Sequence, residues 1–216
     1  MPPTPGAPSR RGGRPTREEA ARLDDDVRTS ALRLFLEGGY DGTSMDAIAA
    51  EAGTTKATLY ARYPSKEAIF REVLEWAMSR KDWPVREAPP PDLDDLEGAL
   101  RAIADAAVRR ALSPSMVKLS RLAVAQAGRF PDLARRSDSH PTWPRRRIVV
   151  ELLERHAASG AIELFDAPET IADLFLGLVS SVPARLASVG VSQDRKALAQ
   201  HTASAIQIFL RALRPS

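Results

Sequence analysis

The sequence predicts an all-α protein. Apolar residues recur at intervals of three and four over most of its 216 residues, which is the spacing of amphipathic helices. No stretch shows the sustained alternation of apolar and polar residues that marks a strand, and the nearest approach is the short segment AIELF at 161–165. We therefore expect helices throughout and no sheet.

The first helix is predicted to begin near Asp24. Three aspartates, 24–26, complement the positive end of the helix dipole. Val27, Ala31 and Phe35 then recur on one face, and the Gly-Gly pair at 38–39 ends the helix.

A short second helix follows, and either Thr43 or Ser44 can supply its N-cap. Met45 and Ile48 begin its buried stripe. Gly53 suits the left-handed conformation in which many helices end. A third short helix, capped at 54 or 55, reaches about residue 63, where the following proline disfavours helix.

Ser65 caps a fourth helix that extends to about residue 81. The segment DWPVREAPPPDLDD, 82–95, is acidic and rich in proline, and we expect it to separate two parts of the chain. Beyond it we expect helices at about 93–112, 115–128, 143–159, 168–188 and 193–213, with a short turn at 131–136.

Composition excludes several classes of protein. The chain has no cysteine, so disulfides, thiolate catalysis and cysteine-bound zinc are excluded. We find no secretory signal and no apolar run long enough to cross a bilayer, and therefore expect a cytoplasmic protein without a membrane partner. The three histidines are scattered and form no catalytic or metal-binding motif, so we expect no enzyme, cofactor or metal.

The second and third helices, at about 44–63, have the arrangement of a helix-turn-helix. On the third helix, Leu59 and Tyr63 share the inward face. The opposite face has alanines at its centre and Lys56 and Tyr60 at its edges, which allows close approach to a DNA groove. The simpler alternative is an exposed, alanine-rich short helix with no binding role.

Residues 24–70 resemble the DNA-binding domain of the TetR family of transcriptional regulators. The matching stretch, ALRLFLEGGYDGTSMDAIAAEAGTTKATLYARYPSKEAIF at 31–70, carries Gly-Tyr, Thr-Ser, Ile-Ala, Ala-Gly, Leu-Tyr and Tyr-Pro-Ser-Lys in the family's order and spacing. The resemblance implies that this third helix is the recognition helix, with phosphate contacts on either side of it. The residues expected to contact DNA are Arg14, Arg17, Thr43, Ser44, Thr55, Lys56, Ala57, Thr58, Tyr60, Arg62 and Lys66.

Two positions depart from the family pattern. Ala57 stands where glycine is frequent, which slightly limits the approach of the backbone to DNA. Arg62 replaces a frequent histidine, and we expect this permanent cation to strengthen phosphate binding.

The N-terminal segment 1–16 is rich in Pro, Gly, Ser and Arg, and we expect it to be a disordered basic arm. Residues 18–85 contain 9 Lys and Arg against 13 Asp and Glu, a net charge of −4. DNA binding must therefore depend on a few placed cations and on the arginine-rich segment RRGGRPTR, 10–17, where Arg14 and Arg17 are the expected contacts. A solubilising tail is the alternative.

The resemblance divides the chain into the arm, a DNA-binding domain at 17–81, and a helical ligand-binding and dimerisation domain at 82–216. The segment LAVAQAGRFPDLARR, 122–136, is similar to AefR-like C-terminal regions. Apolar stripes on the last two helices predict a homodimer, although part of them could instead be buried within the protomer. Helix phase gives Met116, Leu119, Ala123, Trp143 and Phe175 as candidate ligand contacts, for each of which core packing is the alternative.

These observations predict a ligand-responsive regulator, which we expect to repress transcription from a palindromic double-stranded operator and to be released by a mostly apolar small molecule. One alternative is an activator of the same fold. Another is a helical ligand-binding or enzymatic protein with a vestigial helix-turn-helix, against which the missing catalytic constellation argues.

Overall fold

The computed structural model describes residues 16–79, 89–132 and 144–215. Helices account for most of these residues, and the described ranges contain no strand, so the all-α prediction is confirmed. The segment 161–165 is an irregular loop rather than a strand. Its Glu163 backbone N–H donates to the carbonyl of Leu213 at 2.9 Å, which fastens the loop before the penultimate helix to the end of the last one.

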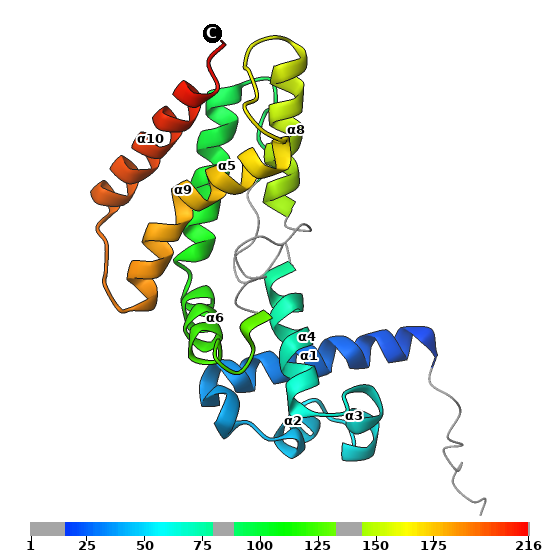
Figure 1. Ribbon diagram of the computed structural model, residues 1–216. Helices are drawn as coiled ribbons and strands as arrows, with labels where there is room; N and C mark the ends of the chain where they lie inside the picture. The colour runs from blue at the N-terminus through cyan, green and yellow to red at the C-terminus, as the bar shows by residue number, and fades with distance from the viewer. Residues whose placement is uncertain (1–15, 80–88, 133–143, 216) are drawn as a thin grey trace, which may run out of the picture.

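The helices form two groups joined by α6. Figure 1 shows α1 to α4 at one end of the molecule and α5, α8, α9 and α10 at the other. The bounds are α1 Arg17–Gly42, α2 Met45–Glu51, α3 Lys56–Arg62, α4 Lys66–Ser79, α5 Leu96–Ala111, α6 Pro114–Ala125, α8 Pro144–Ala158, α9 Pro168–Ser188 and α10 Arg195–Ala212.

Helix α1 starts seven residues before the predicted position, at Arg17 rather than Asp24. Thr16 and Glu19 form a capping box, in which the threonine hydroxyl accepts from the Glu19 N–H at 3.2 Å and the Glu19 carboxylate accepts from the Thr16 N–H at 2.8 Å. This Thr-x-x-Glu signal is visible in the sequence. Arg17 is consequently the exposed first residue of a helix, not part of a flexible arm.

The predicted break at the Gly-Gly pair is present but does not end α1. Gly39 has φ 71° and ψ 179°, and helical residues resume after it up to Gly42. Only glycine adopts this conformation readily. The kink turns the last residues of α1, including the buried Tyr40, towards the start of α4.

The first hydrophobic core unites α1 to α4 with α6. Phe35, Tyr40 and Phe70 form an aromatic cluster whose ring centroids lie 4.9 to 6.1 Å apart. Phe130, just beyond α6, completes it at 5.5 Å from Tyr40. Leu119 on α6 belongs to the same core. The core therefore extends past the boundary expected at 82–95.

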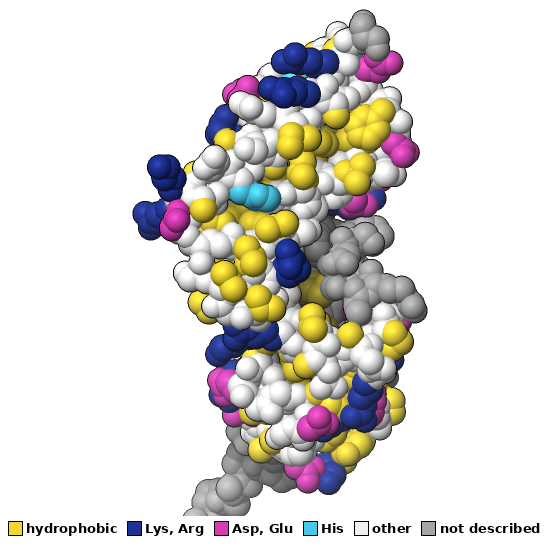
Figure 2. All heavy atoms as spheres, turned by 60° about the vertical axis from the view of Figure 1, so that its left-hand side comes forward, with side chains coloured by type: hydrophobic (Ala, Val, Ile, Leu, Met, Phe, Trp, Pro, Cys, Tyr) yellow, Lys and Arg dark blue, Asp and Glu magenta, His cyan; other side chains and the backbone are white. Residues whose placement is uncertain are grey.

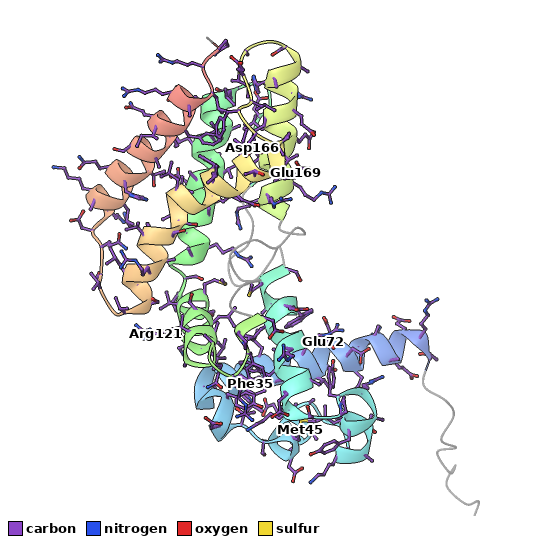
Figure 3. The ribbon with its side chains drawn as sticks, in the orientation of Figure 1. Phe35, Met45, Glu72, Arg121, Asp166 and Glu169 are labelled. Carbon is purple, nitrogen blue, oxygen red and sulfur yellow. The ribbon has the colours of Figure 1, made fainter. Side chains whose placement is uncertain are left out.

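The second core is formed by α5, α8, α9 and α10, with the rings of Phe175 and Phe209 4.7 Å apart. Helix α6 is also fastened to this group, because the Arg121 guanidinium donates to the carbonyls of Ser188 at 2.7 Å and Ala187 at 3.2 Å. Figure 3 labels Arg121 beside the end of α9. Helix α6 thus contacts both groups of helices.

Helix α9, Pro168–Ser188, is long and apolar enough to cross a membrane by length and composition alone. The core helices of soluble proteins pass the same test. Its face with Ile171, Phe175 and Val179 is buried in the second core, and a further apolar face is exposed. Two apolar faces account for its unusual composition.

Candidate nucleic-acid interface

The helix-turn-helix is fixed by side-chain caps at the start of both short helices. Ser44 is the N-cap of α2, where its hydroxyl accepts from the Ala47 N–H at 3.1 Å. Thr55 is the N-cap of α3 and accepts from the Thr58 N–H at 3.1 Å. Gly53 has φ 65° in the turn between the two helices, as expected for a left-handed helix end.

Helix α3 has the two faces that the sequence predicts. Leu59 and Tyr63 are buried against the first core. Lys56 and Ala57 are exposed, and the Tyr60 side chain is 42% exposed. Figure 1 shows α2 and α3 at the extremity of the molecule farthest from α10, so the outward face of α3 is unobstructed by the described part of the chain.

The Lys56 ammonium is paired with an acid on α2. Its Nζ lies 2.8 Å from Asp46 Oδ1 and 3.1 Å from Oδ2. The hydrogen bond and the negative charge raise the pKa of Lys56. The same ammonium lies 6.0 Å from the centroid of the Tyr60 ring. Asp46, Lys56 and Tyr60 thus form one connected group on the exposed face.

Lys66 is anchored at the junction of α1 and α4. Its Nζ donates to the carbonyls of Tyr40 at 2.9 Å and Thr43 at 3.0 Å, and lies 4.5 Å from the Tyr40 ring centroid. An ammonium has three hydrogens, so one remains for a phosphate. Lys66 therefore holds the end of α1 in addition to the phosphate contact expected of it.

Two expected contacts are turned inward. Thr43 is 4% exposed, and its hydroxyl donates to the Gly39 carbonyl at 2.8 Å. The Arg62 Nη1 lies 3.0 Å from Asp24 Oδ1 on α1. Thr43 is buried and the Arg62 side chain is only 25% exposed, against 61% for Lys56, so we keep neither Thr43 nor Arg62 among the proposed contacts. Arg14 lies outside the described residues.

Glu72 sets the position of α3 and was not identified from the sequence. Its Oε1 accepts from Arg28 Nε on α1 at 2.8 Å and from the Tyr63 hydroxyl at the end of α3 at 3.2 Å. Figure 3 labels it on α4, where α4 crosses α1. One carboxylate thus joins three helices, an arrangement that no local sequence pattern reveals.

A second group that the sequence did not reveal lies at the start of α4. The Tyr40 hydroxyl donates to Glu67 Oε1 at 2.8 Å. Burial, followed by this hydrogen bond, raises the pKa of Tyr40 to about 12. The pKa of Glu67 is lowered to about 2, first by its own backbone N–H and then by the hydroxyls of Tyr40 and Ser65.

The candidate ligand contacts do not converge on one site. Met116 and Leu119 pack in or against the first core, whereas Phe175 lies in the second. Ala123 is half-buried on α6, and Trp143 lies outside the described residues. Helical phase shows that a residue lies on an apolar face, but it does not show which neighbouring helix that face meets.

An apolar stripe on α9 and α10 is exposed. Leu174, Leu178 and Val182 follow one another at one-turn spacing on α9, and Ile208 is exposed on α10. Figure 2 shows apolar side chains gathered on the side of the molecule formed by these helices. Four other apolar residues of α9 and α10 are buried within the protomer: Phe175, Val179, Ala205 and Phe209.

The fold and this exposed α3 define a helix-turn-helix DNA-binding protein. Two family models match the chain: bacterial regulatory proteins of the tetR family over residues 28–73, and the AefR-like transcriptional repressor C-terminal domain over residues 98–215. The chain belongs to the TetR family, and the resemblance seen in its sequence is confirmed. Family and fold are those of transcriptional regulators, which bind DNA operators and small-molecule effectors as dimers.

Solved structures support the same assignment. The flavonoid-responsive regulator FrrA is 35% identical, with a TM-score of 0.70, over 90% of this chain and 98% of that one. A TetR-family regulator from Mesorhizobium loti MAFF303099 is 26% identical, with a TM-score of 0.68, over 93% of this chain and 100% of that one.

Among curated proteins, the Staphylococcus epidermidis biofilm operon icaADBC negative transcriptional regulator IcaR is 42% identical over 53 residues. This match covers 24% of the present chain and 29% of IcaR. The similarity to IcaR therefore spans less than a third of that protein.

Proposed function

We propose that this chain is a homodimeric, ligand-responsive repressor that binds a palindromic operator through α2 and α3 and acts in the cytoplasm. The observation that carries the proposal is the division of α3 into a buried face and an exposed face with Lys56, Ala57 and Tyr60. A shallow centre with polar edges suits the major groove. Ser44, Thr55 and Lys66 flank this face as donors to phosphates.

The comparisons with known proteins support repression rather than activation. The printed name of IcaR describes a negative regulator, and the C-terminal family model is that of a repressor. The exposed stripe on α9 and α10 supports a dimer, because antiparallel helix pairs can meet their twofold mates in a four-helix bundle. A dimer can place two copies of α3 about one helical turn of DNA apart, or a multiple of that.

We propose a mostly apolar, aromatic effector. FrrA is named as flavonoid-responsive, and a flavonoid is a molecule of that kind. Effector binding would favour a dimer in which the spacing of the two α3 helices no longer matches the operator. The contacts of α6 with both groups of helices offer a route for this coupling.

The first test is to select bound fragments from the source genome and to measure binding of the enriched duplex by gel shift. Tyr60→Ala should weaken binding about 100-fold or more if Tyr60 contacts the groove, since a good base contact is worth about 1–3 kcal/mol in each half-site. Phe165→Ala, an exposed aromatic change far from α3, is the matched control. Size-exclusion chromatography should show the same dimer for both variants.

Unchanged operator affinity in Tyr60→Ala would contradict the interface. The effector is tested by adding flavonoids, and, for comparison, highly charged metabolites, to the preformed complex. Release by the flavonoids alone is the expected result, and release only by charged metabolites would contradict the proposed effector class.

A further inference from the structure

The pair formed by Asp46 and Lys56 is unusual for its position. Both side chains are well exposed, at 66% and 61%, and exposed ion pairs of this kind stabilise a fold only slightly. The pair nevertheless lies on the face proposed to meet DNA. An acid in such a place repels phosphates, so its effect on binding must be larger than its effect on folding.

Lys56 is the cation that this acid controls. Of the two cations on α3, Arg62 is turned towards Asp24 on α1, and Lys56 alone projects from the exposed face near Tyr60. Both carboxylate oxygens of Asp46 lie within 3.1 Å of its ammonium. In the free protein, the positive charge of the recognition helix is therefore largely neutralised.

Random DNA cannot bind both members of this pair favourably. A phosphate attracts Lys56, but it must compete with a carboxylate already in place and also approach the charge of Asp46. A duplex with the right bases offers more, because a major-groove acceptor such as guanine O6 or N7 can take the ammonium and the amino group of cytosine can donate to the carboxylate. Only that duplex satisfies both members of the pair.

We infer that Asp46 is a specificity-determining residue that lowers the affinity of Lys56 for non-cognate DNA more than for the operator. The inference rests on the proposed function. It concerns how strongly the protein prefers the operator over random DNA, whereas the proposed function requires only that such a preference exists.

The test compares Asp46→Asn with the unaltered protein on two duplexes, the selected operator and a shuffled duplex of the same length and composition, each at several salt concentrations. The shuffled duplex should bind about 5–10-fold more tightly to Asp46→Asn, with a salt dependence steeper by roughly one phosphate contact per protomer. Operator affinity should change by less than about twofold, so the specificity ratio should fall at least about 2.5-fold.

Two controls separate this effect from a change in net charge. Glu97→Gln removes one carboxylate of the exposed pair with Arg101 on α5, which is the same charge change away from α3, and should leave the ratio unaltered. In a Lys56→Gln background, Asp46→Asn should change the ratio much less than it does in the unaltered protein, because the cation that Asp46 neutralises is gone. Asp46→Glu, which keeps the charge, should retain most of the specificity.

The outcomes are distinct. Equal affinity of the unaltered protein for both duplexes would overturn the proposed function and this inference together. A clear operator preference that survives Asp46→Asn, or an equal tightening on both duplexes, would overturn the role of Asp46 alone. Thermal unfolding of each variant shows whether the fold is intact, and loss of specificity only in variants that unfold would likewise count against the inference.

Discussion

The Arg129 guanidinium lies 3.0 Å from the Glu67 carboxylate, although the two residues are 62 positions apart. The same guanidinium lies 4.6 Å from the Tyr40 ring centroid. The segment beyond α6 is thereby docked on the end of α1 and the start of α4. Through this contact, the segment that follows α6 is joined to α4, the helix that carries Glu72.

Replacing Phe130 by alanine should weaken this docking and the whole first core. The ring is 3% exposed and packs against Tyr40 and Phe70, and deleting a buried phenylalanine costs about 3–5 kcal/mol. We expect a loss of that size in the free energy of unfolding, measured with urea. Phe165→Ala, at a ring that is 56% exposed, should cost less than about 0.5 kcal/mol. Equal losses would show that Phe130 is not a core residue.

The lowered pKa of Glu67 predicts that the free energy of unfolding depends on pH. Its pKa is lowered to about 2 by its own backbone N–H and by the hydroxyls of Tyr40 and Ser65. A carboxylate with a lowered folded-state pKa stabilises the protein above its unfolded pKa, and this contribution is lost as the pH falls from about 4.5 towards 2.

The stability difference between the unaltered protein and Glu67→Gln should therefore narrow on acidification. Urea unfolding between pH 7 and pH 3 measures it. Tyr40→Phe removes one donor to the carboxylate and should show a weaker form of the same narrowing. A difference that is constant with pH would contradict the assignment.

Gly39→Ala should destabilise the protein through the backbone alone. At φ 71° and ψ 179° the residue is in a region open almost only to glycine, and a Cβ there would meet nothing within 4 Å. We expect a cost of about 1–3 kcal/mol. Gly42→Ala, also without a steric neighbour but with no positive φ, is the control. If both changes had the same effect, the kink would carry no strain.

Leu178→Glu should weaken the proposed dimer. Leu178 is at the centre of the exposed stripe on α9, and a charge buried in an apolar interface without a partner is strongly unfavourable. Analytical ultracentrifugation should show the dissociation constant raised at least about tenfold, since each 1.4 kcal/mol is a factor of ten. Val124→Glu, an exposed apolar position on α6, should leave it unchanged. If Val124→Glu raised the dissociation constant and Leu178→Glu did not, the dimer interface would lie on α6 instead.

The sequence by itself determined the helices and the faces of the helix-turn-helix. Caps, apolar periodicity and Gly or Pro breaks are local, so Ser44, Gly53, Leu59 and Ser65 could be interpreted from their neighbours. The earlier start of α1 is equally local, since Thr16 and Glu19 form a capping box that the sequence itself shows.

Only the tertiary structure decided which faces meet. Periodicity shows that a residue is apolar on one side of a helix but not which helix covers it, so Leu119 and Phe175 fall in different cores. Ion pairs between distant segments, such as those of Glu72 with Arg28 and of Arg62 with Asp24, depend on how helices cross. Long-range geometry therefore decided which cations of the DNA-binding domain are already paired within the protein and which face outward.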